Sequence, residues 1–252
     1  MTMDPKDALL AALLRLGDDH LVLGHRVSEW CGHAPMLEED LAMPNIGLDL
    51  IGQARALYTY AGEVEGKGRG EDDFAYRRIE REYRNLLLCE RPNGDFGHTM
   101  LRQLYFSAFM EPFWRAACAS SDETVAGIAG KAMKEAAYHV RHSGEWVIRL
   151  GDGTDESRLR MEKAAAALAP YLDELFATDE VWEALEGVMP NPASLKAEWE
   201  ARIAAIFAEA TLERPIVKRA ILGGREGRHG ESMGYLLADL QHIQRTYPGL
   251  TW

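Results

Sequence analysis

Apolar residues recur every three to four positions along most of the chain, which is the spacing of one buried face of an α-helix. Clusters of β-branched residues bounded by turn residues, the usual sign of strands, are nearly absent. The pattern therefore predicts an all-α protein. The expected helices span about residues 5–30, 37–61, 72–88, 97–119, 122–150, 155–176, 179–186 and 191–210, with a last helix after residue 230.

Several helix ends carry recognisable signals. Asp4 followed by Pro5 is a typical helix start, because the carboxylate caps free backbone N–H groups and proline fits the first turn. Glycine-rich stretches at 62–70 and 151–153 predict stops. No internal repeat or linker stands out, so we expect a single domain over residues 1–252. Its core bundle would span about 5–150, with satellite helices over about 155–252.

The charge balance excludes some classes of partner. The 252 residues carry 28 Lys and Arg against 40 Asp and Glu, a formal charge of -12, which argues against a nucleic-acid or membrane partner. The three cysteines (Cys31, Cys89 and Cys118) are far apart and odd in number, so neither a disulfide framework nor a thiolate zinc site is expected. The start of the chain lacks a basic leader, and we expect a cytoplasmic protein.

Long helices with acidic and histidine residues raise the hypothesis of a di-iron four-helix bundle. Such a centre takes one Glu from each of two helices and a Glu-x-x-His motif from each of the other two. Here the second helix offers only Asp49 and Gln53, and the fifth offers Glu135 and His139 at a spacing of four. Because iron needs carboxylate donors, the sequence predicts no intact di-iron centre.

The other histidines have no recurring ligand spacing, so each is expected to be a hydrogen-bonded or surface residue. They are His20, His25, His33, His98, His142, His229 and His242. A mononuclear metal site between His20 and His139 stays open as a minor alternative. No nucleophile elbow, phosphate-binding loop or dinucleotide fingerprint is present in the sequence.

The glycine-rich and basic stretch at 223–230 has two interpretations. It is either a flexible loop before the last helix, or a place where Arg225, Arg228 and His229 contact phosphate or the acidic face of a partner. The chain ends on Trp252, which, if docked, would bury a large area and serve as an interface anchor.

Several blocks of sequence are idiosyncratic rather than compositional. They are EWCGHAP (29–35), NIGLDLIGQAR (45–55), RPNGDF (91–96), KEAAYH (134–139) and RLGDGT (149–154), with QR (244–245), PG (248–249) and Trp252 at the end. On these blocks the chain resembles, nearly end to end, the C-subunit family of the bacterial phenylacetyl-CoA epoxidase (ring 1,2-phenylacetyl-CoA monooxygenase).

The resemblance implies a ferritin-like four-helix bundle with additional C-terminal helices. In the related catalytic A subunits, the second helix carries a Glu and a His where this chain has Leu50 and Gln53, and the fifth carries a ligand Glu where this chain has Ala136. Only His139 remains on the fifth helix. The remaining two ligand positions fall near Ser107 and His20.

The resemblance further implies a non-catalytic structural subunit that pairs with and stabilises the catalytic A subunit in aerobic phenylacetate degradation, beside the other epoxidase components. No catalytic, cofactor-binding or metal residue is expected on this chain. The di-iron centre is expected on the catalytic subunit, with NADPH, flavin and iron–sulfur on the reductase component. A homodimer is plausible when the chain is isolated.

Two alternatives stay open. The chain could be an autonomous ferritin-like metal-dependent oxygenase that uses Glu135, His139, His20 and Asp49. It could also be a ferritin-like binding or storage module without oxygen chemistry.

Overall fold

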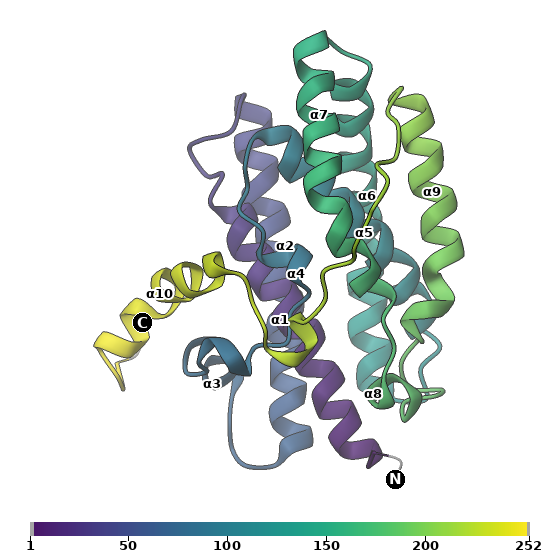
Figure 1. Cartoon of the computed structure of the whole chain (residues 1–252). Coiled ribbons are helices and arrows are strands. Elements are labelled where there is room, and N and C mark those ends of the chain that lie inside the picture. Colours follow the sequence, from purple (N-terminus) through teal and green to yellow (C-terminus); the bar gives the residue numbers. More distant parts are fainter. Residues whose placement is uncertain (1–2, 251–252) are drawn as a thin grey trace. The chain divides into compact units, whose positions relative to one another are not determined.

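The computed structural model describes residues 3–250 and consists, within that range, of helices joined by turns, without a strand (Figure 1). The expectation of an all-α protein is confirmed. The chain divides into two compact units, Met1–Pro92 with Gly223–Trp252, and Asn93–Leu222. The single domain predicted over residues 1–252 stays a prediction. Trp252, the predicted interface anchor, lies outside the described residues.

The first unit is built on two long antiparallel helices, α1 (Pro5–Ser28) and α2 (Leu37–Glu65). The predicted cap is confirmed, because the Asp4 carboxylate accepts the backbone N–H of Lys6 at 2.9 Å. Gly17 interrupts the apolar pattern of α1 for a packing reason. A Cβ at Gly17 would lie 2.5 Å from the Tyr58 ring on α2, so glycine allows the close approach of the two helices.

The prediction of one helix over 72–88 is wrong. The segment forms three short pieces instead, α3 (Glu71–Tyr76), the 3-10 helix η1 (Glu80–Glu82) and α4 (Leu87–Glu90). Between them, the backbone N–H groups of Arg84 and Leu86 donate to carboxylates on α1, at 2.6 Å each. These tertiary hydrogen bonds replace the i to i−4 bonds that a continuous helix would need.

The end of the chain returns to the first unit. The 3-10 helix η4 (Gly224–Glu226) leads to α10 (Glu231–Thr246), which packs on α3 and η1. The predicted division into a core bundle over about 5–150 and satellite helices over about 155–252 stays a prediction. Four residues of α10 are buried. These residues are Met233, Leu236, Leu237 and Gln241.

The second unit is built on the antiparallel pair α5 (Phe96–Ala117) and α6 (Glu123–Gly151). Further elements pack around this pair: α7 (Asp155–Leu168), η2 (Ala169–Phe176), α8 (Glu180–Glu183), η3 (Pro192–Leu195) and α9 (Lys196–Glu209). The helix predicted over 155–176 changes to 3-10 geometry after residue 168, where Pro170 lacks the N–H that an α-helix needs. The short helix predicted over 179–186 spans four residues.

One face of α5 is aromatic and lies in the core of the second unit. Tyr105, Phe109 and Phe113 are buried there, and the rings of Tyr105 and Phe109 contact Trp199 and Phe176 from the satellite elements. Trp199 also donates its indole N–H to the Tyr105 carbonyl at 2.9 Å. Among the described residues, no helix is long and apolar enough to cross a membrane.

Candidate functional site

Three of the sequence-predicted ligand positions lie on buried faces in the first unit. His20 on α1 is buried and donates its Nδ1–H to the Leu16 carbonyl at 2.7 Å. On α2, Leu50 and Gln53 are buried, whereas Asp49 is only half-buried. The two α2 positions compared with a metal-binding Glu and His therefore do face the interior, and they present a hydrocarbon side chain and a neutral amide.

The matching positions in the second unit lie on α5 and α6. Ala136 and His139 are buried on α6, and Glu135 is half-buried and pairs with Lys131 at 3.4 Å. Ser107 on α5 is buried and donates its hydroxyl to the Gln103 carbonyl at 2.7 Å, one turn earlier in the same helix. The interior of this pair is thus lined by small side chains where a ligand carboxylate would be needed.

The donor set does not fit a di-iron centre. Within neither unit do three or more His, Cys, Asp or Glu side chains of residues 3–250 gather as they would to hold a metal ion. Leu50 and Ala136 have no donor atom, and the Gln53 amide carries no charge to offset that of iron. The residues at these positions therefore do not form a set of ligands for two iron ions.

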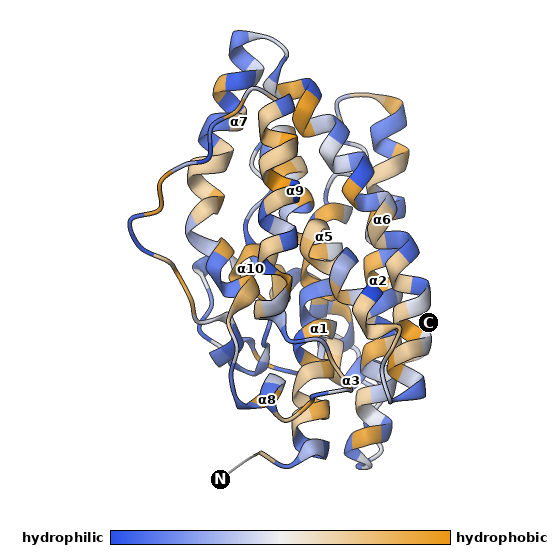
Figure 2. Ribbon diagram, turned by 90° about the vertical axis from the view of Figure 1, so that its right-hand side faces the viewer, coloured by the Kyte–Doolittle hydropathy of each residue, from blue (hydrophilic) through white to orange (hydrophobic). Residues whose placement is uncertain are grey.

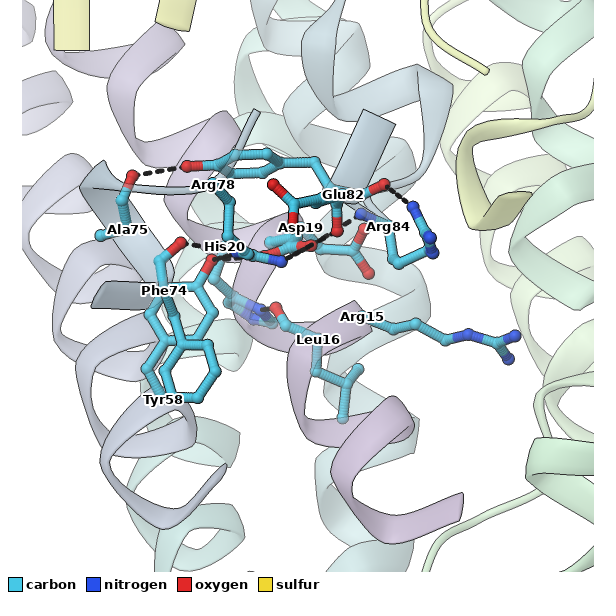
Figure 3. A network of polar contacts seen from close by, with 12 residues as sticks. Arg15, Leu16, Asp19, His20, Tyr58, Phe74, Ala75, Arg78, Glu82 and Arg84 are labelled. Atoms are coloured by element: carbon cyan, nitrogen blue, oxygen red, sulfur yellow. Dashed lines mark hydrogen bonds and ion pairs between the residues drawn. The ribbon is translucent and has the colours of Figure 1, made fainter. Parts of the chain in front are cut away.

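The structure instead brings together a network of buried charges in the first unit, which the sequence analysis missed (Figure 3). Asp18 on α1 is fully buried and lies at its centre. Its carboxylate accepts the Tyr58 hydroxyl at 2.5 Å, the Arg84 N–H at 2.6 Å and two N–H groups of the Arg78 guanidinium. Burial and the charge of Asp18 raise the pKa of Tyr58 well above its ordinary value, so the phenol stays a neutral donor.

Arg78 links this carboxylate to the irregular segment after α3. It donates to the carbonyls of Phe74 at 2.7 Å and Glu82 at 3.1 Å, and its guanidinium lies 4.2 Å from the centre of the Tyr83 ring. All of these contacts join Arg78 to other residues of the same chain, and Arg78 is buried. A buried ion pair with complete hydrogen bonding of this kind is costly to break, because either partner alone would leave an uncompensated charge.

The neighbouring Asp19 binds the C-terminal segment. It accepts two N–H groups of Arg225, at 3.0 and 2.8 Å, and the backbone N–H of Leu86 at 2.6 Å. Burial raises the pKa of Asp19 to about 6, although Arg225 acts in the opposite direction. Neither interpretation of the 223–230 stretch holds for Arg225, since it binds a buried carboxylate of its own chain. Arg228, by contrast, is exposed and pairs with Glu226.

Glu90 also binds the 223–230 stretch. Its carboxylate accepts His229 Nδ1–H at 2.7 Å and the Gly230 N–H at 2.6 Å. The other ring nitrogen of His229 donates to the Tyr83 carbonyl at 3.1 Å. Because both nitrogens face acceptors, the geometry requires the doubly protonated imidazolium. Burial lowers the pKa of His229, but the hydrogen bond and charge of Glu90 outweigh it, and the net pKa is raised.

This pair predicts a pH dependence of stability that His229→Gln removes. Because the pKa of His229 is raised in the folded state, its stabilising contribution is complete below the ordinary value of 6.5 and is lost as pH rises through the folded pKa. We expect the urea midpoint of the wild type to fall between about pH 6 and about pH 9, and that of the variant to change less.

This pH range separates the titration of His229 from that of the other groups in the network. Asp19 titrates at about 6, so it is ionised through most of the range. The neighbouring carboxylates of Glu90 and Glu80 both favour the protonated imidazole and remain in the variant. His242→Gln, on the exposed side of α10, is the matched control. An equal pH slope in the wild type and in His229→Gln would contradict the assignment.

Comparison with known proteins places the chain in a family. The family model for phenylacetic acid catabolic protein matches residues 1–252. The chain belongs to the phenylacetic acid catabolic protein family. A curated relative in this family is the C subunit of the 1,2-phenylacetyl-CoA epoxidase of Escherichia coli (strain K12), which is 47% identical over 246 residues, or 97% of this chain and 99% of the relative.

Membership of the phenylacetic acid catabolic protein family confirms the resemblance drawn from the sequence blocks, and the helical structure agrees with the ferritin-like fold class expected of it. The relative is named as one subunit of an epoxidase, which implies other subunits beside it.

The buried charge network had one signal in the sequence. Asp18 and Asp19 lie between the apolar runs 8–14 and 21–23, and such a pair is seldom buried without partners.

Proposed function

We propose that this chain is a structural subunit of a phenylacetyl-CoA epoxidase in aerobic phenylacetate degradation, and that it has no active site of its own. It pairs with the catalytic subunit, which carries the di-iron centre, and stabilises it. The observation that supports this most directly is the presence of Leu50 and Ala136 on buried faces, at positions where metal-binding carboxylates would be needed. The identity to the C subunit of a known epoxidase supports the assignment to that enzyme.

The physical argument concerns the cost of buried charge. A carboxylate that no longer binds metal keeps its full desolvation cost, so an apolar side chain at that position stabilises the helix pair. Asp18 and Asp19, two carboxylates buried in the first unit, are each matched by an arginine of the same chain. The interior is therefore arranged for stability. NADPH, flavin and the iron–sulfur cluster belong in this proposal to the reductase component.

Reconstitution of the epoxidase from its purified components tests the proposal. Leaving this chain out is expected to abolish epoxidation, while the catalytic subunit retains its iron. Unimpaired activity without this chain would refute the structural role.

A metal measurement separates the proposal from the two alternatives. The chain is purified alone, offered ferrous iron without oxygen, and its iron content is measured by mass spectrometry. We expect less than about a tenth of an equivalent, because the described donor set lacks carboxylates where iron needs them. Two equivalents would instead favour an autonomous oxygenase built on Glu135, His139, His20 and Asp49. Iron uptake by a self-assembled shell would favour a storage module.

A further inference from the structure

An apolar face of α2 is exposed although the opposite face of the same helix lies in the core of its unit. Leu37, Leu41 and Leu48 are 71%, 61% and 64% exposed. Single exposed leucines are common on protein surfaces, whereas several on one helix face are typical of an interaction site. Figure 2 shows the hydrophobic positions that run along α2.

The spacing of this face is that of a helix–helix contact. Residues 37, 41, 44, 48 and 51 alternate steps of four and three, and they hold leucine, proline or isoleucine throughout. At 3.6 residues per turn they fall within a stripe about 80° wide. Steps of four and three are the a and d spacing by which one helix packs against another. We call these five residues the α2 seam.

The charged residues that flank the seam between residues 37 and 51 are acidic, and the next position on the same stripe, Arg55, is exposed and pairs with Glu71 at 2.9 Å. Glu38 is exposed on one side of the stripe, and Asp40 is half-buried on the other side. The Asp40 carboxylate accepts the backbone N–H of Gly32 at 2.7 Å, which holds it at the rim. Between residues 37 and 54 the sequence contains no lysine or arginine.

This rim decides what kind of partner fits. A second copy of the chain would place the same acidic rim against itself, because a twofold contact uses the same patch on both copies. Like charges across an interface are costly, and opposite charges favour association. The fitting occupant is therefore a helix with an apolar seam bordered by lysine or arginine, from a different chain.

We propose that the α2 seam is the docking surface for such a basic-bordered helix of the catalytic epoxidase subunit. The identity of the partner rests on the proposed function, whereas the chemistry of the docking helix rests on the seam and its rim. A stable interface covers about 800 Å² on each partner, more than one helix seam offers, so the seam forms its apolar centre and neighbouring surfaces complete it.

The test measures binding of the purified catalytic subunit to the full chain. The double variant Leu41→Glu/Leu48→Glu places two carboxylates in the seam at exposed positions, where the fold tolerates them. We expect its affinity to fall at least about a hundredfold, since apolar residues at the centre of an interface carry most of the binding energy. Glu38→Lys is expected to weaken binding and to reduce its dependence on salt.

The matched control adds the same charges elsewhere. Leu159→Glu/Ile216→Glu changes two exposed apolar residues of the second unit and is expected to bind as the wild type does. Circular dichroism checks that each variant is folded.

Three outcomes would overturn the inference in distinguishable ways. If the wild type does not bind the catalytic subunit, the proposed function fails along with it. If the wild type and the seam variant bind equally well, only the docking surface is wrong. If the wild type alone forms a dimer that the seam variant abolishes, the occupant is a second copy and the basic partner is refuted.

Discussion

Asp18→Asn is expected to lower the free energy of unfolding by about 3–5 kcal/mol, the loss typical of a buried ion pair with one partner removed. Asparagine has nearly the same shape, so packing is preserved while the charge that balances Arg78 disappears. Arg78 is buried and cannot turn to water without breaking its bonds to the Phe74 and Glu82 carbonyls. Urea unfolding followed by circular dichroism measures the loss.

A second variant and a surface control make this prediction sharper. In Asp18→Asn/Arg78→Met both charges are removed, and the loss should be smaller than the sum of the two single losses, because neither charge is left alone. Glu156→Gln breaks an ion pair with Arg160 that lies in solvent, and its urea midpoint should equal that of the wild type. A loss below about 1 kcal/mol for Asp18→Asn would show that the pair contributes no more than a surface one.

Trp199→Ala is expected to destabilise the second unit by a similar amount, about 3–5 kcal/mol, as truncation of a large buried aromatic residue usually does. Trp199 is among the largest fully buried side chains, and its ring contacts Tyr105 and Phe176. Its loss removes the contacts that Trp199 of α9 makes with α5 and with η2. Thermal and urea unfolding followed by tryptophan fluorescence and circular dichroism measure the effect.

Two further tryptophan variants divide this loss into its parts. Trp199→Phe keeps most of the ring but loses the hydrogen bond to the Tyr105 carbonyl, so about 1 kcal/mol is expected. Trp146→Ala on α6 removes a half-buried ring and should cost less than Trp199→Ala. Equal losses for Trp146→Ala and Trp199→Ala would mean that α9 is not anchored as described.

The burial of the positions that were compared with metal ligands could be predicted from the sequence to a large extent. Leu50, Gln53, Ala136 and His139 all lie on buried faces, as the helical spacing and the family resemblance implied. That spacing is local, since residues three or four apart share a face whatever the rest of the chain does. The buried charge network could not be predicted in this way. Arg225 is separated from Asp19 by 206 residues, and no local pattern reports such a pairing.

The idiosyncratic sequence blocks were enough to identify the family. Local patterns were enough to predict the all-α class and most helix ends. These features follow from periodic apolar residues and from caps such as Asp4, which act over one or two turns. The break of the helix predicted over 72–88 and the return of residues 223–246 to the first unit depend instead on contacts between distant segments. In both places the carboxylates of Asp18, Asp19 and Glu90 accept hydrogen bonds from backbone and side-chain donors. A buried charge is costly without such partners, and this cost outweighs the local propensity to form a helix.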